Sequence, residues 1–267
     1  MKPKKLALVG CGYLGNIIAR AYTDGLLEGY ELVGVMSRTR ESAQKTAVLA
    51  GCKACDTIEE LLKLRPDYVA EAASVQTVRD LALKVLGGGA HLVVLSIGAF
   101  ADAEFYEQVK AAALENGTQV HLASGAIGGF DVLQTISLMA QAEGYSEQAG
   151  ISTRKGPESL RNTPVFQEEL IKARRESTVF DGCAKDAIAL FPTKVNVAVA
   201  TALATTGPQI TGVKITSVPG FLGDDHQITA EIKGVKAVVD IYSSTSAIAG
   251  WSVVALLRNL ISPIAFQ

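Results

Sequence analysis

Apolar and polar positions follow two periodic patterns, one strand-like and one helix-like, which alternate along the first half of the chain. Short apolar runs bounded by polar or glycine residues predict strands at 5–9, 31–36, 67–73, 90–96 and 118–123. Segments with apolar residues every three to four positions predict helices at 13–27, 40–49, 57–64, 75–86 and 102–116. Because strands alternate with helices of this length, we expect parallel pairing and an α/β, Rossmann-type doubly wound sheet.

The regular alternation of predicted strands and helices ends after residue 123. Helix-like patterns lie at 127–142, 181–191 and 196–205, with a strand-like segment at 150–156. Period-two alternation then predicts antiparallel strands at 212–218, 226–232 and 236–244, before a final helix at 247–260. This part of the chain is typical of an α+β domain.

These patterns divide the chain without a low-complexity linker. We predict a dinucleotide-binding domain at 1–123, an α+β substrate, catalytic and dimerisation domain at 124–246, and a helix at 247–267 that packs back on the first domain. We expect the two domains to form a cleft, in which cofactor and substrate meet outside the carboxyl ends of the parallel strands.

A glycine-rich turn joins the first predicted strand to the first predicted helix. The stretch "GCGYLG" has the G-x-G-x-x-G spacing of a dinucleotide fingerprint and comprises Gly10, Cys11, Gly12, Tyr13, Leu14 and Gly15. Gly10 permits a tight turn, Gly12 lets the backbone approach a pyrophosphate, and Gly15 lets the helix pack close to its strand. We therefore expect Gly10, Gly12, Tyr13, Leu14 and Gly15 to bind a nicotinamide dinucleotide.

The end of the second predicted strand bears on the choice of cofactor. NAD-binding domains commonly place Asp or Glu there to bond the ribose hydroxyls, whereas this chain has Ser37 followed by Arg38. A hydroxyl and a guanidinium would bind a phosphate on that ribose. We therefore expect Ser37 and Arg38 to favour NADP, with NAD as the other usable cofactor.

Composition and charge exclude several classes of function. The 267 residues are 48% hydrophobic and 19% charged, and the net charge is −2, which argues against a nucleic-acid surface. No apolar stretch has the length of a membrane span, so we expect a cytoplasmic protein. The four cysteines include a C-x-x-C pair, Cys52 and Cys55, but neither a second such pair nor a nearby histidine. We expect reduced, partly buried thiols and no metal site.

Several stretches beyond the glycine turn are rich in small and polar residues. They are "EAAS" (71–74), "SIGAFAD" (96–102), "SGAIGG" (124–129), "STRKGP" (152–157), "FDGCAKDAIALFPTKVNVAVA" (180–200) and "DDHQI" (224–228). Together with the fingerprint they resemble the L-aspartate dehydrogenase family over nearly the whole chain. "SGAIGG" with "FP-x-x-VN" and one downstream histidine is more specific than the Rossmann motif alone.

The resemblance implies a reaction, a cofactor and site residues. Members of the family interconvert L-aspartate and iminoaspartate with NAD(P), and the imine hydrolyses to oxaloacetate and ammonia or feeds NAD biosynthesis. It implies a homodimer, cofactor contacts from Ala126 and Asn196, and His226 as the catalytic residue. From "EAAS" we add Ala72 and Ala73 to the expected cofactor contacts. Two departures lie near His226: Ser-Val-Pro replaces the family's Ala-Asp-Pro, and Asp224 replaces an Asn.

The chemistry at His226 follows from oxidation of an amine. A proton must leave nitrogen and a water must then be activated, and one imidazole with a pKa of about 6.5 can do both. His91 and His121 fall in predicted strands and are expected to be structural, whereas His226 follows two acids in a loop-like stretch. One of those acids could orient the ring. Candidates to bind the substrate carboxylates are Arg154, Lys155 and Lys194.

Two other functions are compatible with part of this pattern. Another NAD(P)H-dependent reductase of two-domain plan, similar to dihydrodipicolinate reductase or to a sugar oxidoreductase, would share the fingerprint but not "SGAIGG" with "VNV". A non-catalytic dinucleotide-binding redox sensor would need the glycine turn alone and would make His226 dispensable.

Overall fold

The chain folds into two compact units in the computed structural model, which describes residues 2–191 and 195–266. The first unit comprises Met1–Gly125 with Ala247–Gln267, and the second comprises Ala126–Ser246. The second unit is therefore an insertion between the strands of the first unit and the helix that completes it.

The first unit is a six-stranded parallel sheet with the order β3-β2-β1-β4-β5-β6. Its strands are β1 (Lys4–Val9), β2 (Tyr30–Met36), β3 (Lys53–Cys55), β4 (Tyr68–Glu71), β5 (His91–Val94) and β6 (Val120–Leu122). Its helices are α1 (Tyr13–Thr23), α2 (Arg40–Ala50), α3 (Ile58–Leu62), α4 (Val75–Gly87), α5 (Ala103–Asn116) and α10 (Ala247–Ile261), with a 3₁₀ turn η1 (Ile97–Ala101). The strand order reverses between β1 and β4, which is where α/β sheets bind ligands. The predicted doubly wound fold is confirmed.

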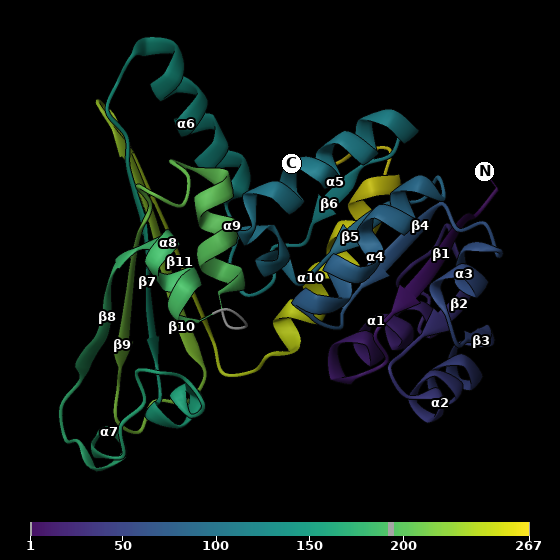
Figure 1. The fold of residues 1–267 in the computed structure, drawn as a ribbon, viewed down its shortest axis with the longest axis horizontal. Helices are drawn as coiled ribbons and strands as arrows, with labels where there is room; N and C mark the ends of the chain where they lie inside the picture. The colour runs from purple at the N-terminus through teal and green to yellow at the C-terminus, as the bar shows by residue number, and fades with distance from the viewer. Residues whose placement is uncertain (1, 192–194, 267) are drawn as a thin grey trace. The chain divides into compact units, whose positions relative to one another are not determined.

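A single apolar cluster binds α1, α2 and α10 to one face of this sheet (Figure 1). Leu6 and Leu8 of β1 are completely buried there, and so is Leu257 of α10. The Tyr30 hydroxyl donates a hydrogen bond of 2.7 Å to the Leu257 carbonyl oxygen. Because β1 is the central strand of the switch point, α10 supports the same part of the sheet that carries the glycine turn.

The second unit contains a five-stranded sheet with the order β11-β10-β7-β9-β8. Its strands are β7 (Gln148–Lys155), β8 (Ser177–Cys183), β9 (Gly212–Ser217), β10 (Asp224–Ile232) and β11 (Val235–Ser243). Its helices are α6 (Phe130–Glu143), α7 (Glu169–Lys172), α8 (Ala184–Leu190) and α9 (Asn196–Ala204), with a 3₁₀ turn η2 (Pro157–Leu160). Helices α6, α8 and α9 lie on one face of the sheet (Figure 1). The α+β class predicted for this part is confirmed.

Some predicted elements differ from those observed. Strand β9 is parallel to β7 and antiparallel to β8, so the expectation that 212–218 is simply antiparallel was incomplete. Residues 181–183 belong to strand β8 rather than to a helix, because α8 begins only after Cys183, whose backbone is extended. The first helix ends at Thr23, and glycines with positive φ at Gly25 and Gly29 explain why it does not continue to 27.

Two structural features bear on the excluded classes. Within the described ranges, no helix has both the length and the apolar character that a membrane crossing requires. The four cysteines are free thiols, with Cys11 and Cys55 buried and Cys52 and Cys183 half-buried. Burial raises the pKa of the Cys52 thiol to about 11, which keeps it protonated and unreactive near neutral pH.

Candidate active site

The glycine turn between β1 and α1 is packed so tightly that two of its positions have no room for a side chain. Gly10 has φ +102°, and a Cβ there would overlap the carbonyl oxygen of Ala72. A Cβ on Gly15 would overlap the Gly10 carbonyl oxygen. The turn and the first turn of α1 therefore approach each other as a dinucleotide fingerprint requires.

Gly12 has the opposite environment. Its φ is −78°, which any residue can adopt, and a Cβ there would meet no atom within 4 Å. The protein itself therefore gives no reason for a glycine at this position. Gly12 instead lies at the N-terminus of α1, where unpaired N–H groups and the helix dipole attract phosphate. The open space above Gly12 fits the backbone approach of a pyrophosphate.

A groove of about 800 Å³ runs along this edge of the sheet. Its lining includes the predicted contacts Gly10, Gly12, Ser37, Arg38, Ala72 and Ala73. Tyr13 and Leu14 lie in the first turn of α1, where the Tyr13 side chain is exposed and Leu14 packs against the apolar core. The groove brings the carboxyl ends of β1, β2 and β4 together, and its size and donors suit a nicotinamide dinucleotide.

Hydroxyl groups surround the position expected to bind the adenosine ribose. Ser37, Thr39 and Ser42 line the groove beside Arg38. Arg38 is exposed and enters no ion pair with any residue in the described part of the chain. Arg40, by contrast, forms an ion pair of 2.9 Å with Asp56. Of the two arginines, Arg38 is thus the one whose guanidinium is available to a ligand.

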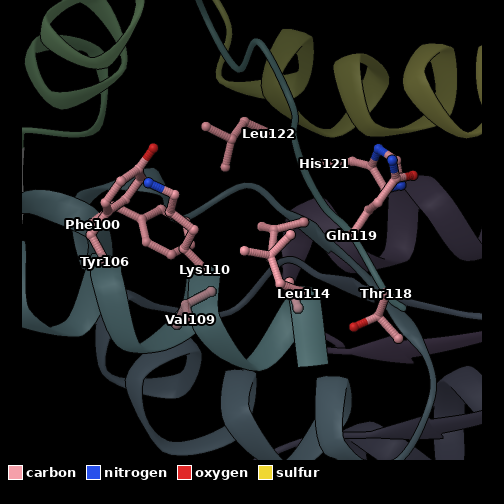
Figure 2. A pocket seen from close by; sticks show the side chains of 11 residues that line it. Phe100, Tyr106, Val109, Lys110, Leu114, Thr118, Gln119, His121 and Leu122 are labelled. Atoms are coloured by element: carbon pink, nitrogen blue, oxygen red, sulfur yellow. The ribbon is translucent and has the colours of Figure 1, made fainter. Parts of the chain in front are cut away.

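A second cavity of the first unit has a different character. It measures about 350 Å³ and lies between α5 and the edge strand β6. Figure 2 shows Phe100, Tyr106 and Val109 on one side of β6, whereas His121 extends to the other side with Gln119. The His121 ring lies near His91, which stacks on Tyr68 with ring centroids 5.1 Å apart. This cavity contains none of the predicted site residues.

His226 is the third residue of strand β10 rather than part of a loop, which corrects the sequence interpretation. Its side chain is 4% exposed. Asp224 and Asp225 suggested a turn, but they pair with Ser243 and Tyr242 across the antiparallel ladder with β11. The nearly complete burial of a histidine marks a specific environment, because a solvated loop ring would stay exposed.

The buried ring has one hydrogen-bond partner in the neighbouring strand. Thr153 Oγ1 lies 2.9 Å from His226 Nδ1, and the two residues pair directly across β7 and β10. When Nδ1–H donates to Thr153, Nε2 carries the lone pair and can accept a proton. Burial lowers the pKa of His226 to about 4, so the ring is neutral near pH 7. Sequence reasoning missed Thr153, since only the strand register places it beside the histidine.

The acids next to His226 have other partners. Asp224 forms an ion pair of 3.0 Å with Lys155, and the same carboxylate acts in the direction of raising the His226 pKa. The partner that orients the ring is therefore not an acid as expected, because Nδ1 forms its hydrogen bond with the Thr153 hydroxyl. Burial and the nearby Asp240 carboxylate raise the pKa of Asp225. Asp225 directly precedes His226 in β10, so the two side chains point to opposite faces of the sheet.

Strand alternation separates the candidate cations. Lys155 lies two residues from Thr153 and shares its face of the sheet, which is also the face of His226. Arg154 lies on the opposite face and forms an ion pair of 2.9 Å with Glu176. Lys194 lies outside the described residues. Lys155 is thus the candidate that the fold places on the side of the histidine.

The two expected cofactor contacts of the second unit lie in a turn and at the start of a helix. Ala126 follows Gly125, which has φ +66°, in the turn between β6 and α6. Asn196 is the first residue of α9. Among the described residues, no group of three or more His, Cys, Asp or Glu side chains is arranged to hold a metal ion.

Thr153→Val is expected to lower kcat about 10-fold, because one hydrogen bond worth roughly 1.4 kcal/mol fixes the reactive tautomer. Steady-state kinetics of the two variants and the wild type measures the loss. Thr153→Ser keeps the hydroxyl and serves as the matched control, with kcat expected to stay close to that of the wild type. Equal losses in both variants would mean that the methyl group, rather than the hydrogen bond, matters.

Comparison with known proteins assigns the chain to a family. Residues 10–123 match the family model "Homoserine dehydrogenase, NAD binding domain", and residues 136–260 match "Aspartate dehydrogenase, C-terminal". The L-aspartate dehydrogenase of Methanosarcina acetivorans is 32% identical over 97% of this chain and 98% of its own length. The chain belongs to the L-aspartate dehydrogenase family. The family resemblance predicted from the motifs is confirmed.

Other members and solved structures agree with the family assignment. The L-aspartate dehydrogenase of Methanocaldococcus jannaschii is 29% identical over 97% of this chain and 98% of its own. The crystal structure of aspartate dehydrogenase from Thermotoga maritima superposes with a TM-score of 0.78 at 25% identity, covering 99% of both chains. A biliverdin reductase from Synechocystis, at 13% identity and a TM-score of 0.52, shares the fold alone. The aspartate dehydrogenase of Thermotoga maritima thus shares the fold of this chain over its full length.

Proposed function

We propose that this protein is an NAD(P)-dependent L-aspartate dehydrogenase that interconverts L-aspartate with iminoaspartate, and through it with oxaloacetate and ammonia. One observation carries the proposal. The match to L-aspartate dehydrogenases spans 97% of the chain, so the glycine turn and His226 both fall within it. The dinucleotide groove and a buried neutral histidine are the two parts that amine oxidation requires.

Residues of the chain have defined roles in this reaction. Gly10, Gly12, Ala72 and Ala73 hold the dinucleotide, whose nicotinamide supplies the acceptor for the hydride that leaves the substrate's Cα. His226 Nε2 takes a proton from the substrate nitrogen, so that the C–N single bond becomes a C=N double bond. After the ring has released this proton to solvent, it accepts a proton from the water that attacks the imine carbon and returns it to the nitrogen, so that ammonia leaves and oxaloacetate forms.

Lys155 is proposed to bind a substrate carboxylate. Its ammonium lies on the face of His226 and is paired with Asp224 at 3.0 Å. A substrate carboxylate can replace or share this partner, because an ammonium group donates three hydrogen bonds. The negative charge of the bound substrate would also raise the low pKa of His226, which makes the ring a stronger base when aspartate is present.

Ammonium dependence tests the reaction. With oxaloacetate and NADPH, the purified protein is expected to oxidise NADPH only when ammonium is added, and the amino-acid product is L-aspartate. Absorbance at the NADPH band measures the oxidation of NADPH, and chiral analysis identifies the amino-acid product. Equal rates without ammonium would identify a hydroxy-acid dehydrogenase, and turnover of a different carbonyl compound alone would place the protein with other two-domain reductases.

The cofactor preference is proposed to be for NADP over NAD. Arg38→Ala removes the guanidinium that is proposed to bind the ribose phosphate, so KM for NADPH is expected to rise roughly 10- to 100-fold while KM for NADH changes little. Arg40→Ala is the matched control, because Arg40 is held by Asp56 and should leave the ratio unchanged. A wild-type protein with lower KM for NADH would contradict the interpretation of Ser37 and Arg38.

The oligomeric state is proposed from the family resemblance alone. We propose a homodimer through the second unit, and sedimentation velocity at micromolar concentration measures the mass directly. A monomer at this concentration would remove the proposal without affecting the proposed reaction.

A further inference from the structure

Glu71 is a buried carboxylate that the proposed chemistry does not use. It is the last residue of β4, the strand that follows the reversal of strand order, and it is 2% exposed. An ionisable group is rarely buried to this extent unless it has partners, because burying an unpaired charge is costly. Its partners therefore indicate what the residue does.

Four donors converge on the two carboxylate oxygens. The Ala73 amide and the Ser96 hydroxyl donate to Oε1 at 2.7 and 2.8 Å. The Leu95 and Ser96 amides donate to Oε2 at 3.2 and 3.0 Å. Three of these donors follow the end of β5 and one follows the end of β4, so a single side chain ties together the segments beyond two adjacent strands.

All of these partners are donors, which defines the group that the site accepts. A carboxylate offers acceptor sites alone and can satisfy every one of them. A glutamine of the same shape has one oxygen and one NH₂ group, so its NH₂ would face N–H donors. Burial raises the pKa of Glu71 above its ordinary value, and the four hydrogen bonds offset part of this effect because each of them favours the ionised form.

The segment that Glu71 holds is part of the dinucleotide groove. Ala72 and Ala73 line the groove, and the Ala72 carbonyl oxygen is the atom against which Gly10 is packed. The Ala72 amide donates to the Val9 carbonyl oxygen at 2.8 Å, just before the glycine turn. Displacement of this segment would therefore move both the wall of the groove and the surface that supports Gly10.

We infer that Glu71 is a positioning residue for the cofactor, which fixes the 72–73 segment against the glycine turn by hydrogen bonds from two strand ends. The inference rests on the proposed function only in requiring that the groove bind a nicotinamide dinucleotide. It requires no particular substrate. Glu71 acts through Ala72 and Ala73 and makes no contact of its own with the reacting atoms, since its oxygens are occupied by backbone and serine donors.

Glu71→Gln tests the inference by direct binding. The Kd for NADPH, measured by calorimetry without substrate, is expected to rise roughly 10- to 100-fold, while kcat at saturating cofactor falls less than threefold. Amide hydrogen exchange is expected to accelerate at Ala73, Leu95 and Ser96. Ser96→Ala removes one donor and is expected to raise Kd about threefold, so the inference stays testable even if Glu71→Gln does not fold.

Tyr30→Phe is the matched control. It removes one buried hydrogen bond in the same unit, to Leu257, without touching the groove. A comparable loss of thermal stability in Tyr30→Phe with unchanged Kd would show that instability alone does not weaken binding. Unchanged Kd in Glu71→Gln would overturn the inference, and so would weaker binding with unaltered amide exchange, because that result means direct contact with the cofactor. Absence of aspartate turnover with intact cofactor binding would instead count against the proposed function.

Discussion

His226→Ala is expected to lower kcat for aspartate oxidation by roughly 100- to 10,000-fold, the usual contribution of a positioned acid–base group. The ring is the proton acceptor of the proposed reaction, and Thr153 holds it in one orientation. The Kd for NADPH should change little, because the glycine turn belongs to the other unit. Steady-state kinetics and cofactor binding on the same preparation measure both quantities.

The half-buried His121 provides the control for this variant. His121→Asn alters a ring in the first unit that is outside the dinucleotide groove, and its kcat is expected to stay within about twofold of the wild type. Near-normal kcat in His226→Ala with intact NADPH binding would rule out His226 as the base. A loss confined to KM would mean that the ring binds a substrate carboxylate and does not transfer protons.

The pH dependence follows from the lowered pKa. With a pKa of about 4 in the free protein, His226 is neutral from neutral pH down to about pH 5 and becomes protonated below that range. The acid limb of kcat/KM that belongs to this residue is therefore expected near pH 4, not near neutrality as an unperturbed imidazole would give. This limb should disappear in His226→Ala.

The same shift affects stability. A histidine whose folded pKa lies below its unfolded pKa favours the unfolded state once that state takes up the proton. Stability is then lost progressively as pH falls from about 6.5 toward 4, which is the interval between the ordinary and the shifted pKa.

Gly12→Ala and Gly15→Ala are expected to separate cofactor binding from folding. A methyl group on Gly12 meets no protein atom within 4 Å, so the melting temperature should stay near that of the wild type. The methyl group would fill the space that a pyrophosphate needs, and the Kd for NADPH should rise roughly 10- to 100-fold, which is about 1.4–2.8 kcal/mol.

Gly15→Ala should behave in the opposite way. A Cβ at Gly15 overlaps the Gly10 carbonyl oxygen, which is backbone and cannot move aside cheaply. Overpacking of this kind costs about 1–3 kcal/mol or more, so thermal denaturation should show a clear loss of stability before any ligand is added. Calorimetric scans of the two variants, each with and without NADPH, give four melting temperatures that separate loss of stability from loss of binding. A stable Gly15→Ala with normal binding would contradict the observed packing of the turn.

The first unit was largely predictable because its information is local. The glycine turn, the parallel strands and most helices are encoded in spacing and periodicity, and they lie close to the predicted positions. Strand β3 was missed, since Lys53–Cys55 is too short to show a period. Ser37 and Arg38 could be predicted at the groove because the carboxyl ends of the parallel strands in this fold lie at its ligand-binding edge.

The surroundings of His226 could not be predicted in the same way. Gly223 and two acids before the histidine are typical of a loop, yet pairing with β7 and β11 turns the segment into a strand. The partner Thr153 is 73 residues away in sequence, and only the cross-strand register brings it to the ring. The loss of water around the ring, which sets its pKa, is likewise a tertiary effect.

The place of α10 has a consequence for how the molecule assembles during synthesis. Strands β1 to β6 leave the ribosome before the whole second unit, yet their apolar face is covered by Val253, Val254 and Leu257, which are translated afterwards. Nascent domains commonly fold in order of synthesis. In this protein, however, Leu6 and Leu8 of the sheet stay partly uncovered until α10 has been synthesised. The first unit can therefore complete its core only after α10 has been synthesised, and a chain stalled before Ala247 is expected to present an exposed apolar face to chaperones.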